Sequence, residues 1–413
     1  MFQKIIRHAI LAEGVILVMS LFIVAIFRQD EKQSYVDAEQ VMSQETMAGE
    51  WESPEEFTKE ELDKATEEYS EPEEGEAKET TQSLETTEKK FIKWVDFNVC
   101  VEAMNDAYEL DVESYESEVH LNWIELLAYL GTKYGGDFKQ YKSKDLTTLA
   151  DKLVNEKIPM KEITADMQYY SYYYEAYEAV LGGFVGEYEI EVTNSDATAG
   201  ANGLENDKKT KDKKWEKKYG LKAFLPIAKN FPYNDYDDFG VARSYGYRRQ
   251  HLGHDMMGQV GTPIIAVESG YVEALGWNQY GGWRIGIRSL DNKRYYYYAH
   301  LRQNYPYVKN LEVGSIVQAG DVIGYLGRTG YSTKENTNNI DTPHLHFGMQ
   351  LIFDESQKEG NNEIWINCYN IVRFLYQNRS ETTKNEETKE WYRIYNIVDP
   401  SVTEYKLKHG LKL

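Results

Sequence analysis

The chain has 413 residues, which is more than one ordinary domain needs and enough for two domains with sizeable cores. Its formal net charge is −22, but residues 30–90 alone hold 21 acidic and 6 basic residues and account for −15 of it. The remainder is only mildly acidic and shows no basic face, which argues against a nucleic-acid partner because binding phosphates requires such a face.

The first segment, residues 1–29, is predicted to be a cytoplasmic flank followed by a transmembrane signal anchor. Residues 14–27 are apolar, and with residues 9–12 they approach the ~20 residues that a spanning helix needs. Lys4 and Arg7 precede this run, and cationic flanks stay in the cytoplasm, so the rest of the chain is expected outside a bacterial cell membrane. A cleaved signal peptide is the alternative, although no small-x-small site follows the run.

Residues 30–90 are rich in Glu, Thr, Ser and Gln and hold few large apolar side chains. Such a segment buries too little surface to offset the entropy of ordering, so we expect an acidic disordered stalk. Repulsion among its carboxylates would extend it.

Residues 91–192 are predicted to form an α-helical domain. Leu121, Ile124 and Leu127 repeat at helical spacing, and Gly135 is a typical stop after them. Asp145 is the expected N-cap of the next helix, and a Tyr-rich helix should end at Gly182. The tyrosines could stack on sugars, but packing is the interpretation we favour. This domain could also bind protein partners.

Residues 193–218 carry small and charged residues without periodicity, which predicts a linker. Residues 219–376 change to short β-branched and aromatic runs separated by glycine turns, which is typical of an antiparallel β-domain. For residues 377–413 we expect a helix and a closing strand. Cys100 and Cys368 are far apart and outside any CxxC pair; a bridge between them is open, but two free thiols are the favoured interpretation.

Two histidine clusters carry the candidate chemistry. In the first, His251 and Asp255 are four residues apart in a segment that Gly253 keeps from being helical, so both side chains can face one cation. In the second, His344 and His346 share one face of a predicted strand. Two imidazoles and a carboxylate with one open position are the arrangement of a catalytic zinc site.

The motifs in their order resemble the lysostaphin-type (LytM-type) zinc endopeptidases. They run over residues 230–355: His-x-Gly-x-Asp, Gly-Thr-Pro, Tyr-Ala-His-Leu at 298–301, two glycine turns and His-Leu-His-Phe at 344–347. The resemblance implies an antiparallel β-fold and cleavage of peptidoglycan peptides. It also implies one Zn²⁺ per chain, held by the metal ligands His251, Asp255 and His346.

The resemblance further assigns His344 and His300 as the non-ligand histidines beside the attacking water. We expect His344 to act as general base and His300 to orient the water or stabilise the oxyanion, although the sequence leaves open which of them is the base. His254 should point away from His251 and be structural, and Arg249 is expected to pair with a carboxylate or with substrate.

The sequence therefore predicts a multidomain α+β protein with a transmembrane helix, a helical middle domain and a C-terminal all-β metallopeptidase domain. Its predicted function is zinc-dependent hydrolysis of peptide bonds in peptidoglycan outside the membrane. A non-hydrolytic scaffold or activator in a membrane-associated cell-wall complex is the alternative. A membrane protease that cuts ordinary proteins is a further possibility.

Overall fold

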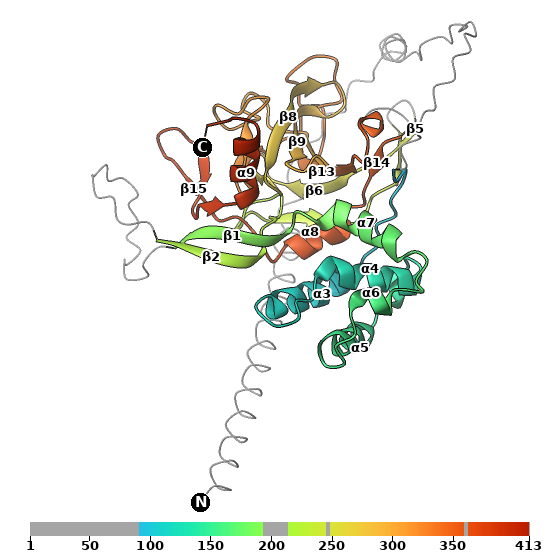
Figure 1. Ribbon diagram of the computed structural model, residues 1–413. Helices are drawn as coiled ribbons and strands as arrows, with labels where there is room; N and C mark the ends of the chain where they lie inside the picture. The colour runs from blue at the N-terminus through green and yellow to red at the C-terminus, as the bar shows by residue number, and fades with distance from the viewer. Residues whose placement is uncertain (1–90, 193–213, 245–247, 359–361, 413) are drawn as a thin grey trace, which may run out of the picture. The chain divides into compact units, whose positions relative to one another are not determined.

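Figure 1 shows the computed structural model of the chain. The structure describes residues 91–192, 214–244, 248–358 and 362–412. The expected anchor, the expected stalk and most of the expected linker lie outside these residues. Among the helices of the described part, none combines the length and apolar character that crossing a membrane requires.

The middle of the chain is helical, as the spacing of its apolar residues predicts. Its helices are α3 (Val101–Ser114), α4 (Trp123–Tyr134), α5 (Ser143–Val154), α6 (Met160–Ile163) and α7 (Tyr170–Leu181), with a 3-10 turn at Phe138–Gln140. Gly135 caps α4 in the left-handed conformation at φ +60, and α7 ends at Gly182. Both predicted stops are therefore confirmed.

The predicted N-cap at Asp145 is wrong. Helix α5 begins at Ser143, two residues earlier, so Asp145 lies in its first turn. The Asp145 carboxylate instead accepts hydrogen bonds from Lys133 at 2.7 Å and from the Tyr134 hydroxyl at 2.7 Å. Spacing along the chain could not reveal this use, because both donors come from the end of α4.

Two long strands frame the expected linker. Strand β1 (Val185–Val192) pairs antiparallel with β2 (Lys214–Leu221) from Val185↔Leu221 to Val192↔Lys214, and β17 (Ile397–Val398) adds a third strand. Residues 185–192 are thus not helical, and residues 214–218 belong to a strand. The predicted closing strand near the C-terminus matches β17.

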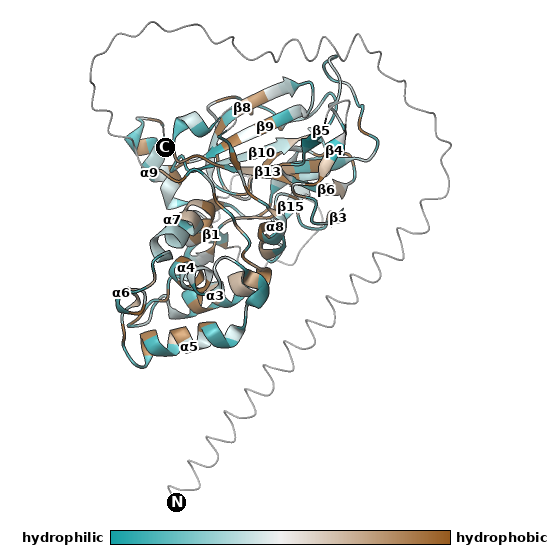
Figure 2. Cartoon of the chain, turned by 90° about the vertical axis from the view of Figure 1, so that its right-hand side faces the viewer, coloured by the Kyte–Doolittle hydropathy of each residue, from teal (hydrophilic) through white to brown (hydrophobic). Residues whose placement is uncertain are grey.

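The candidate site lies on an eight-stranded antiparallel sheet with the order β11-β8-β9-β10-β13-β6-β3, in which β14 also pairs with β13. Figure 2 shows β8, β9, β10, β13 and β6 side by side. The strands are β3 (Tyr233–Asp235), β6 (His254–Gly258), β8 (Gly270–Asn278), β9 (Gly282–Ser289), β10 (Arg294–Ala299), β11 (Ile316–Val317), β13 (His344–Leu351) and β14 (Ile364–Trp365).

Six short strands, paired two by two, and two helices complete the described part of the C-terminal half. Strand β7 (Pro263–Ile265) pairs with β12 (Val322–Tyr325), and β4 (Ala242–Ser244) pairs with β5 (Arg248–Gln250). Strands β15 (Thr382–Lys384) and β16 (Trp391–Arg393) form a further hairpin. The helices are α8 (Tyr369–Leu375) and α9 (Pro400–Lys408).

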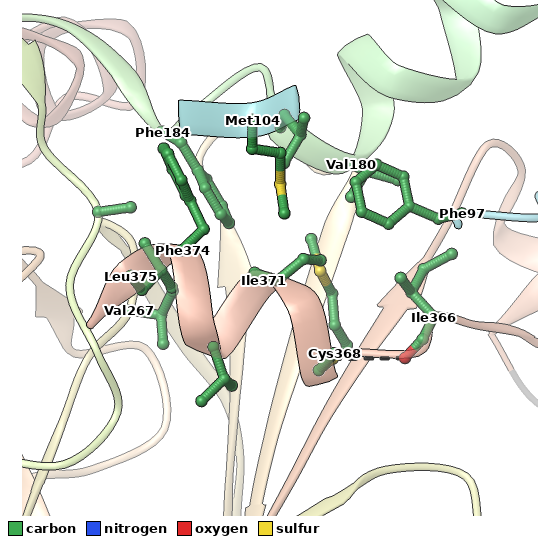
Figure 3. Packing of buried hydrophobic residues seen from close by; sticks show 14 of the residues in the cluster. Phe97, Met104, Val180, Phe184, Val267, Ile366, Cys368, Ile371, Phe374 and Leu375 are labelled. Carbon is green, nitrogen blue, oxygen red and sulfur yellow. Dashed lines mark hydrogen bonds between the residues drawn. The ribbon is translucent and has the colours of Figure 1, made fainter. Parts of the chain in front are cut away.

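Helix α8 joins the helical region to the sheet. Figure 3 shows its Ile371, Phe374 and Leu375 packed among Met104 of α3, Phe184 and Val267, all of them buried. Across the same junction, the buried guanidinium of Arg294 on β10 donates to the backbone oxygen of Ala179 on α7 at 2.8 Å and pairs with Glu268. The helices and the sheet therefore share one hydrophobic core.

The two cysteines are free thiols, as the sequence interpretation favours. Cys368 is fully buried and Cys100 is half-buried.

Candidate metal centre

His251, Asp255 and His346 converge although they come from different parts of the fold. Asp255 lies on β6 directly opposite His346 on β13, and His251 lies in the turn that leads into β6. The His251 Nε2 and His346 Nδ1 atoms are each within 3.0 Å of Asp255 Oδ1, and 2.9 Å from one another. The structure thus brings together the three predicted ligands, which form a group able to hold a metal ion.

The donor set fits zinc. Three protein ligands of nitrogen and oxygen type, with room for a fourth ligand, are typical of catalytic zinc sites, and a tetrahedral site with bonds of about 2.1 Å places its ligands about 3.4 Å apart. The separations above are roughly 0.5 Å shorter, so small side-chain shifts would admit the ion. The site is also largely shielded from solvent, because His251 and Asp255 are 3% and 4% exposed.

Gly253 makes this convergence sterically possible. A Cβ atom at this position would lie 2.5 Å from Cε1 and Nε2 of the His346 ring and 3.0 Å from the backbone oxygen of Phe347. Any side chain there would push His346 away from Asp255. The sequence identified Gly253 only as a helix breaker, whereas its main role is to admit the imidazole ring.

The electrostatics of the three side chains depend on their mutual contacts. Burial opposes a charge on His251, but hydrogen bonds with Asp238 and Asp255 outweigh it and raise its pKa to about 9. Burial also opposes the charge of Asp255, yet hydrogen bonds from His251 and His346 lower its pKa. Burial lowers the pKa of His346. Asp255 therefore stays ionised, and its negative charge favours a cation between the three side chains.

Asp238 and Arg243 are contacts that sequence reasoning missed. His251 Nδ1 lies 3.1 Å from both the backbone oxygen and Oδ2 of Asp238, which leaves Nε2 directed toward the other ligands. Arg243 lies 2.8 Å from Asp255 Oδ2 and also pairs with Asp238. A ligating histidine ordinarily donates its other ring N–H to a carboxylate or a backbone carbonyl. This rule predicts a partner for His251, but it does not say which residue supplies it.

The structure places Arg249 against Tyr331. Its guanidinium donates to the hydroxyl of Tyr331 and lies over the Tyr331 ring, 5.3 Å from the centroid. The expected pairing of Arg249 with a carboxylate or with substrate stays a prediction, and Arg243 is the arginine that pairs with Asp255. His254 follows its prediction, since its Nε2 lies 2.9 Å from Asp235 Oδ2 on β3.

His344 and His300 lie beside the three converging side chains. Their rings are 4.7 Å apart, and His344 Nε2 is 3.7 Å from Asp255 Oδ2. His344 Nδ1 donates to the Thr342 backbone oxygen at 2.8 Å, and His300 Nδ1 donates to that of Thr329 at 2.9 Å. In a neutral ring this leaves the lone pair on Nε2, so each histidine offers a proton acceptor.

The position of His300 depends on an unusual backbone. His300 has a φ of +62, and burial lowers its pKa well below the ordinary range, which keeps the ring neutral. Gly330 beside it has a φ of +124, and a Cβ there would lie 2.4 Å from the Tyr280 backbone oxygen and 3.1 Å from His300 Nδ1. The glycine turn at Gly330 thus makes room for His300.

The tyrosine run of β10 divides between the two faces of the sheet, as predicted. Tyr296 and Tyr298 are buried in the core, at 1% and 0% exposed. Tyr297 lies on the other face, with its ring 5.9 Å from that of His346. We call the face that carries Asp255, His344 and His346 the site face.

Comparisons with known proteins match the chain to one peptidase family and to endopeptidases. The sequence model of Peptidase family M23 matches residues 249–363. An L-Ala–D-Glu endopeptidase of Bacillus subtilis (strain 168) is 42% identical over 161 residues, which cover 39% of this chain and 47% of that protein. Lysostaphin of Staphylococcus simulans is 40% identical over 98 residues, covering 24% of this chain and 17% of that protein.

Among solved structures, the catalytic domain of lysostaphin from Staphylococcus simulans matches with 30% sequence identity and a TM-score of 0.27. The match covers 34% of this chain and 92% of that domain. The chain spans less than half the length of the two curated relatives.

Proposed function

We propose that the chain is a zinc-dependent endopeptidase that hydrolyses peptide bonds in peptidoglycan, because its residues 249–363 match Peptidase family M23. The observation that supports this most is the convergence of His251, Asp255 and His346 within 3.0 Å, with two further histidines beside them. The names of the relatives support the reaction type, since they are endopeptidases.

His251, Asp255 and His346 would hold the zinc ion in this mechanism. Bound there, zinc would polarise the scissile carbonyl and lower the pKa of the attacking water. His344 acts as the general base: its Nε2 takes a proton from the water and passes it to the leaving amine. The Thr342 carbonyl fixes the ring orientation that this transfer requires.

His300 is better suited to orienting the water than to stabilising an oxyanion. Its Nδ1 proton is donated to Thr329, and its lowered pKa keeps Nε2 without a proton. Nε2 can therefore accept a hydrogen bond from water but cannot donate one to a negatively charged oxygen. Of the two roles expected for His300, orienting the water is therefore the one that we propose.

We further propose that the enzyme acts outside the cell membrane, held by an anchor in residues 1–29 and an acidic stalk in residues 30–90. The support is the apolar run preceded by Lys4 and Arg7. The membrane is then one partner and wall peptides are the other, and the helical domain offers a surface for protein partners.

The function is tested by incubating purified peptidoglycan with the full chain and identifying new peptide termini by mass spectrometry. We expect about one zinc per chain and wall hydrolysis, both lost in H346A, because two remaining ligands hold zinc poorly. The matched control is H409A, which alters an exposed histidine at the end of α9.

Three outcomes would count against parts of the proposal. Unchanged hydrolysis by H346A would refute the metal assignment. Zinc binding without any hydrolysis would favour the non-hydrolytic scaffold. Cleavage of casein as fast as of wall peptides would indicate a protease without wall specificity.

A further inference from the structure

A transverse row of residues crosses the sheet and leads from the metal centre to an arginine. Asp255 on β6 lies opposite His346 on β13, and His346 lies opposite Ala299 on β10. On the next pair of strands, Tyr298 of β10 lies opposite Ile285 of β9, so Arg284, which precedes Ile285, faces the side of the sheet that Ala299 faces. Residues that are directly opposite share a face of the sheet. Arg284 therefore lies on the site face.

Arg284 stands two strands away from His346. Neighbouring strands are ~4.8 Å apart, so the Cα atoms of the two residues are about 10 Å apart. The row continues to Gly276 on β8, which pairs with Arg284 and has open space where a Cβ would be. Because the residue of β8 opposite Arg284 is a glycine, it has no side chain that could cover the guanidinium.

Two arginines of β9 on this face differ in their partners. Arg288 is 1% exposed and pairs with Glu273 at 3.3 Å and with Glu355 at 3.1 Å. Arg284 is half-buried, and in the described part of the chain its Nε atom is buried without a hydrogen-bond partner and its guanidinium has no carboxylate within ion-pair distance. A buried donor without a partner costs free energy, which a ligand that accepts its hydrogen bonds would recover.

Two tyrosines of the site face lie close to Arg284. Tyr295 extends over Gly286, where a Cβ would be 1.9 Å from its hydroxyl, and Gly286 is two residues from Arg284 on the same face. Burial raises the pKa of Tyr295 to about 12 against the opposing charge of Arg284. Burial also raises the pKa of Tyr297, and the charge of Arg284 again opposes this rise. The guanidinium thus lies near the phenols of Tyr295, Tyr297 and Tyr307 and has no ion-pair partner among the described residues.

We propose that Arg284 binds a carboxylate of the peptide substrate and so determines a preference for acidic wall peptides. A planar guanidinium with free N–H groups matches a carboxylate in two parallel hydrogen bonds. An extended peptide advances ~3.3 Å per residue, so the carboxylate lies within about three residues of the scissile bond. This inference rests on the proposed function, because it assigns the substrate class of the same site.

The test compares one synthetic stem peptide with its glutamate carboxylate free and the same peptide with that carboxylate amidated. We measure kcat/KM for both peptides with the wild-type full chain, R284Q and R284K. The wild type should prefer the free carboxylate by at least about tenfold, mainly through KM. In R284Q the ratio should fall to about one, and R284K should keep part of the preference because it keeps the charge.

Binding of both peptides is also measured directly by calorimetry, so that the two proposals fail separately. If the wild type cleaves neither peptide, the proposed function fails, while tighter binding of the free carboxylate that R284Q abolishes still supports the role of Arg284. The matched control is R302Q, an exposed arginine that lines a separate cavity of 410 Å³ with Lys384 and Lys389.

Equal zinc content and equal melting temperatures in wild type and R284Q exclude a disturbed fold as the cause. The inference is overturned if the wild type binds both peptides equally, if R284Q keeps the preference, or if R302Q loses it to the same extent.

Discussion

Asp238 holds His251 from behind, and the consequence should be visible in metal affinity. In D238N the backbone oxygen still accepts from His251 Nδ1, but the carboxylate that also pairs with Arg243 is lost. Removing such a supporting group typically weakens metal binding 10–100-fold, and because one acceptor remains we expect the lower end, about tenfold. Competition with a chelator of known zinc affinity measures the change.

The matched control for this variant is D235N, which alters a carboxylate of the neighbouring strand β3 that contacts His254. We expect its zinc affinity to equal that of the wild type. An unchanged affinity in D238N, or an equal loss in D235N, would contradict the positioning role of Asp238.

For single residues, the sequence predicted the three metal ligands but not the residue that holds one of them in place. His251, Asp255 and His346 followed from spacing and from the family resemblance, because strand periodicity fixes which side chains share a face. Asp238 lies 13 residues before His251, and the β4–β5 hairpin lies between them. The pairing of this hairpin brings Asp238 back to His251, and the spacing of residue types in the sequence does not show that pairing.

Among the secondary-structure elements, α9 has a buried carboxylate at its N-terminus that helps to hold it against the fold. Asp399 caps α9 by accepting from the backbone of Ser401, and it pairs with Lys222 at 3.0 Å, with both side chains largely buried. Burial opposes its charge, but Lys222 and Ser401 outweigh this and lower its pKa. A lowered pKa in the folded state stabilises the fold above the unfolded pKa of about 3.9.

Stability should therefore fall as the pH falls below about 4 and Asp399 takes up a proton. In D399N the amide still caps the helix but cannot pair with Lys222, so we expect the free energy of unfolding at pH 7 to decrease by roughly 1–3 kcal/mol. Because the variant has no carboxylate to protonate, its difference from the wild type should shrink between pH 4 and pH 2. Urea unfolding at several pH values measures both effects.

The control is E386Q, which removes an exposed partner of Lys389. Its unfolding midpoint should match the wild type at each pH, since exposed ion pairs contribute little. A D399N difference that stays constant down to pH 2 would show that the stabilisation does not depend on ionisation of Asp399.

The sequence predicted most of the helices and strands. It failed where contacts between distant segments determine the structure. Stops at Gly135 and Gly182 followed from local conformational preference. The pairing of β1 with β2 was missed because its two strands are separated by 21 residues, and pairing over such a span leaves no local pattern.

For the whole molecule, the sequence predicts separate helical and β-domains joined by a linker, and in the structure one large buried cluster contains residues of both regions. Apolar periodicity shows which face of a helix is buried but not what it packs against. Helix α8, which follows the last sheet strand, supplies the contact: Phe374 lies 5.5 Å from the ring of Trp123 on α4 and 5.8 Å from that of Tyr108 on α3.

A shared core should unfold as one unit, and F374A tests this. Removing a fully buried phenylalanine typically costs 3–5 kcal/mol, through lost burial and the cavity that remains. If the helices and the sheet depend on each other, hydrogen exchange followed by mass spectrometry should show the same loss of protection in α4 and in β13. The control L407A, at a position 62% exposed, should change neither. Faster exchange in α4 with β13 unchanged would mean that the helices open independently, and the metal centre would then be insulated from events in the helical region.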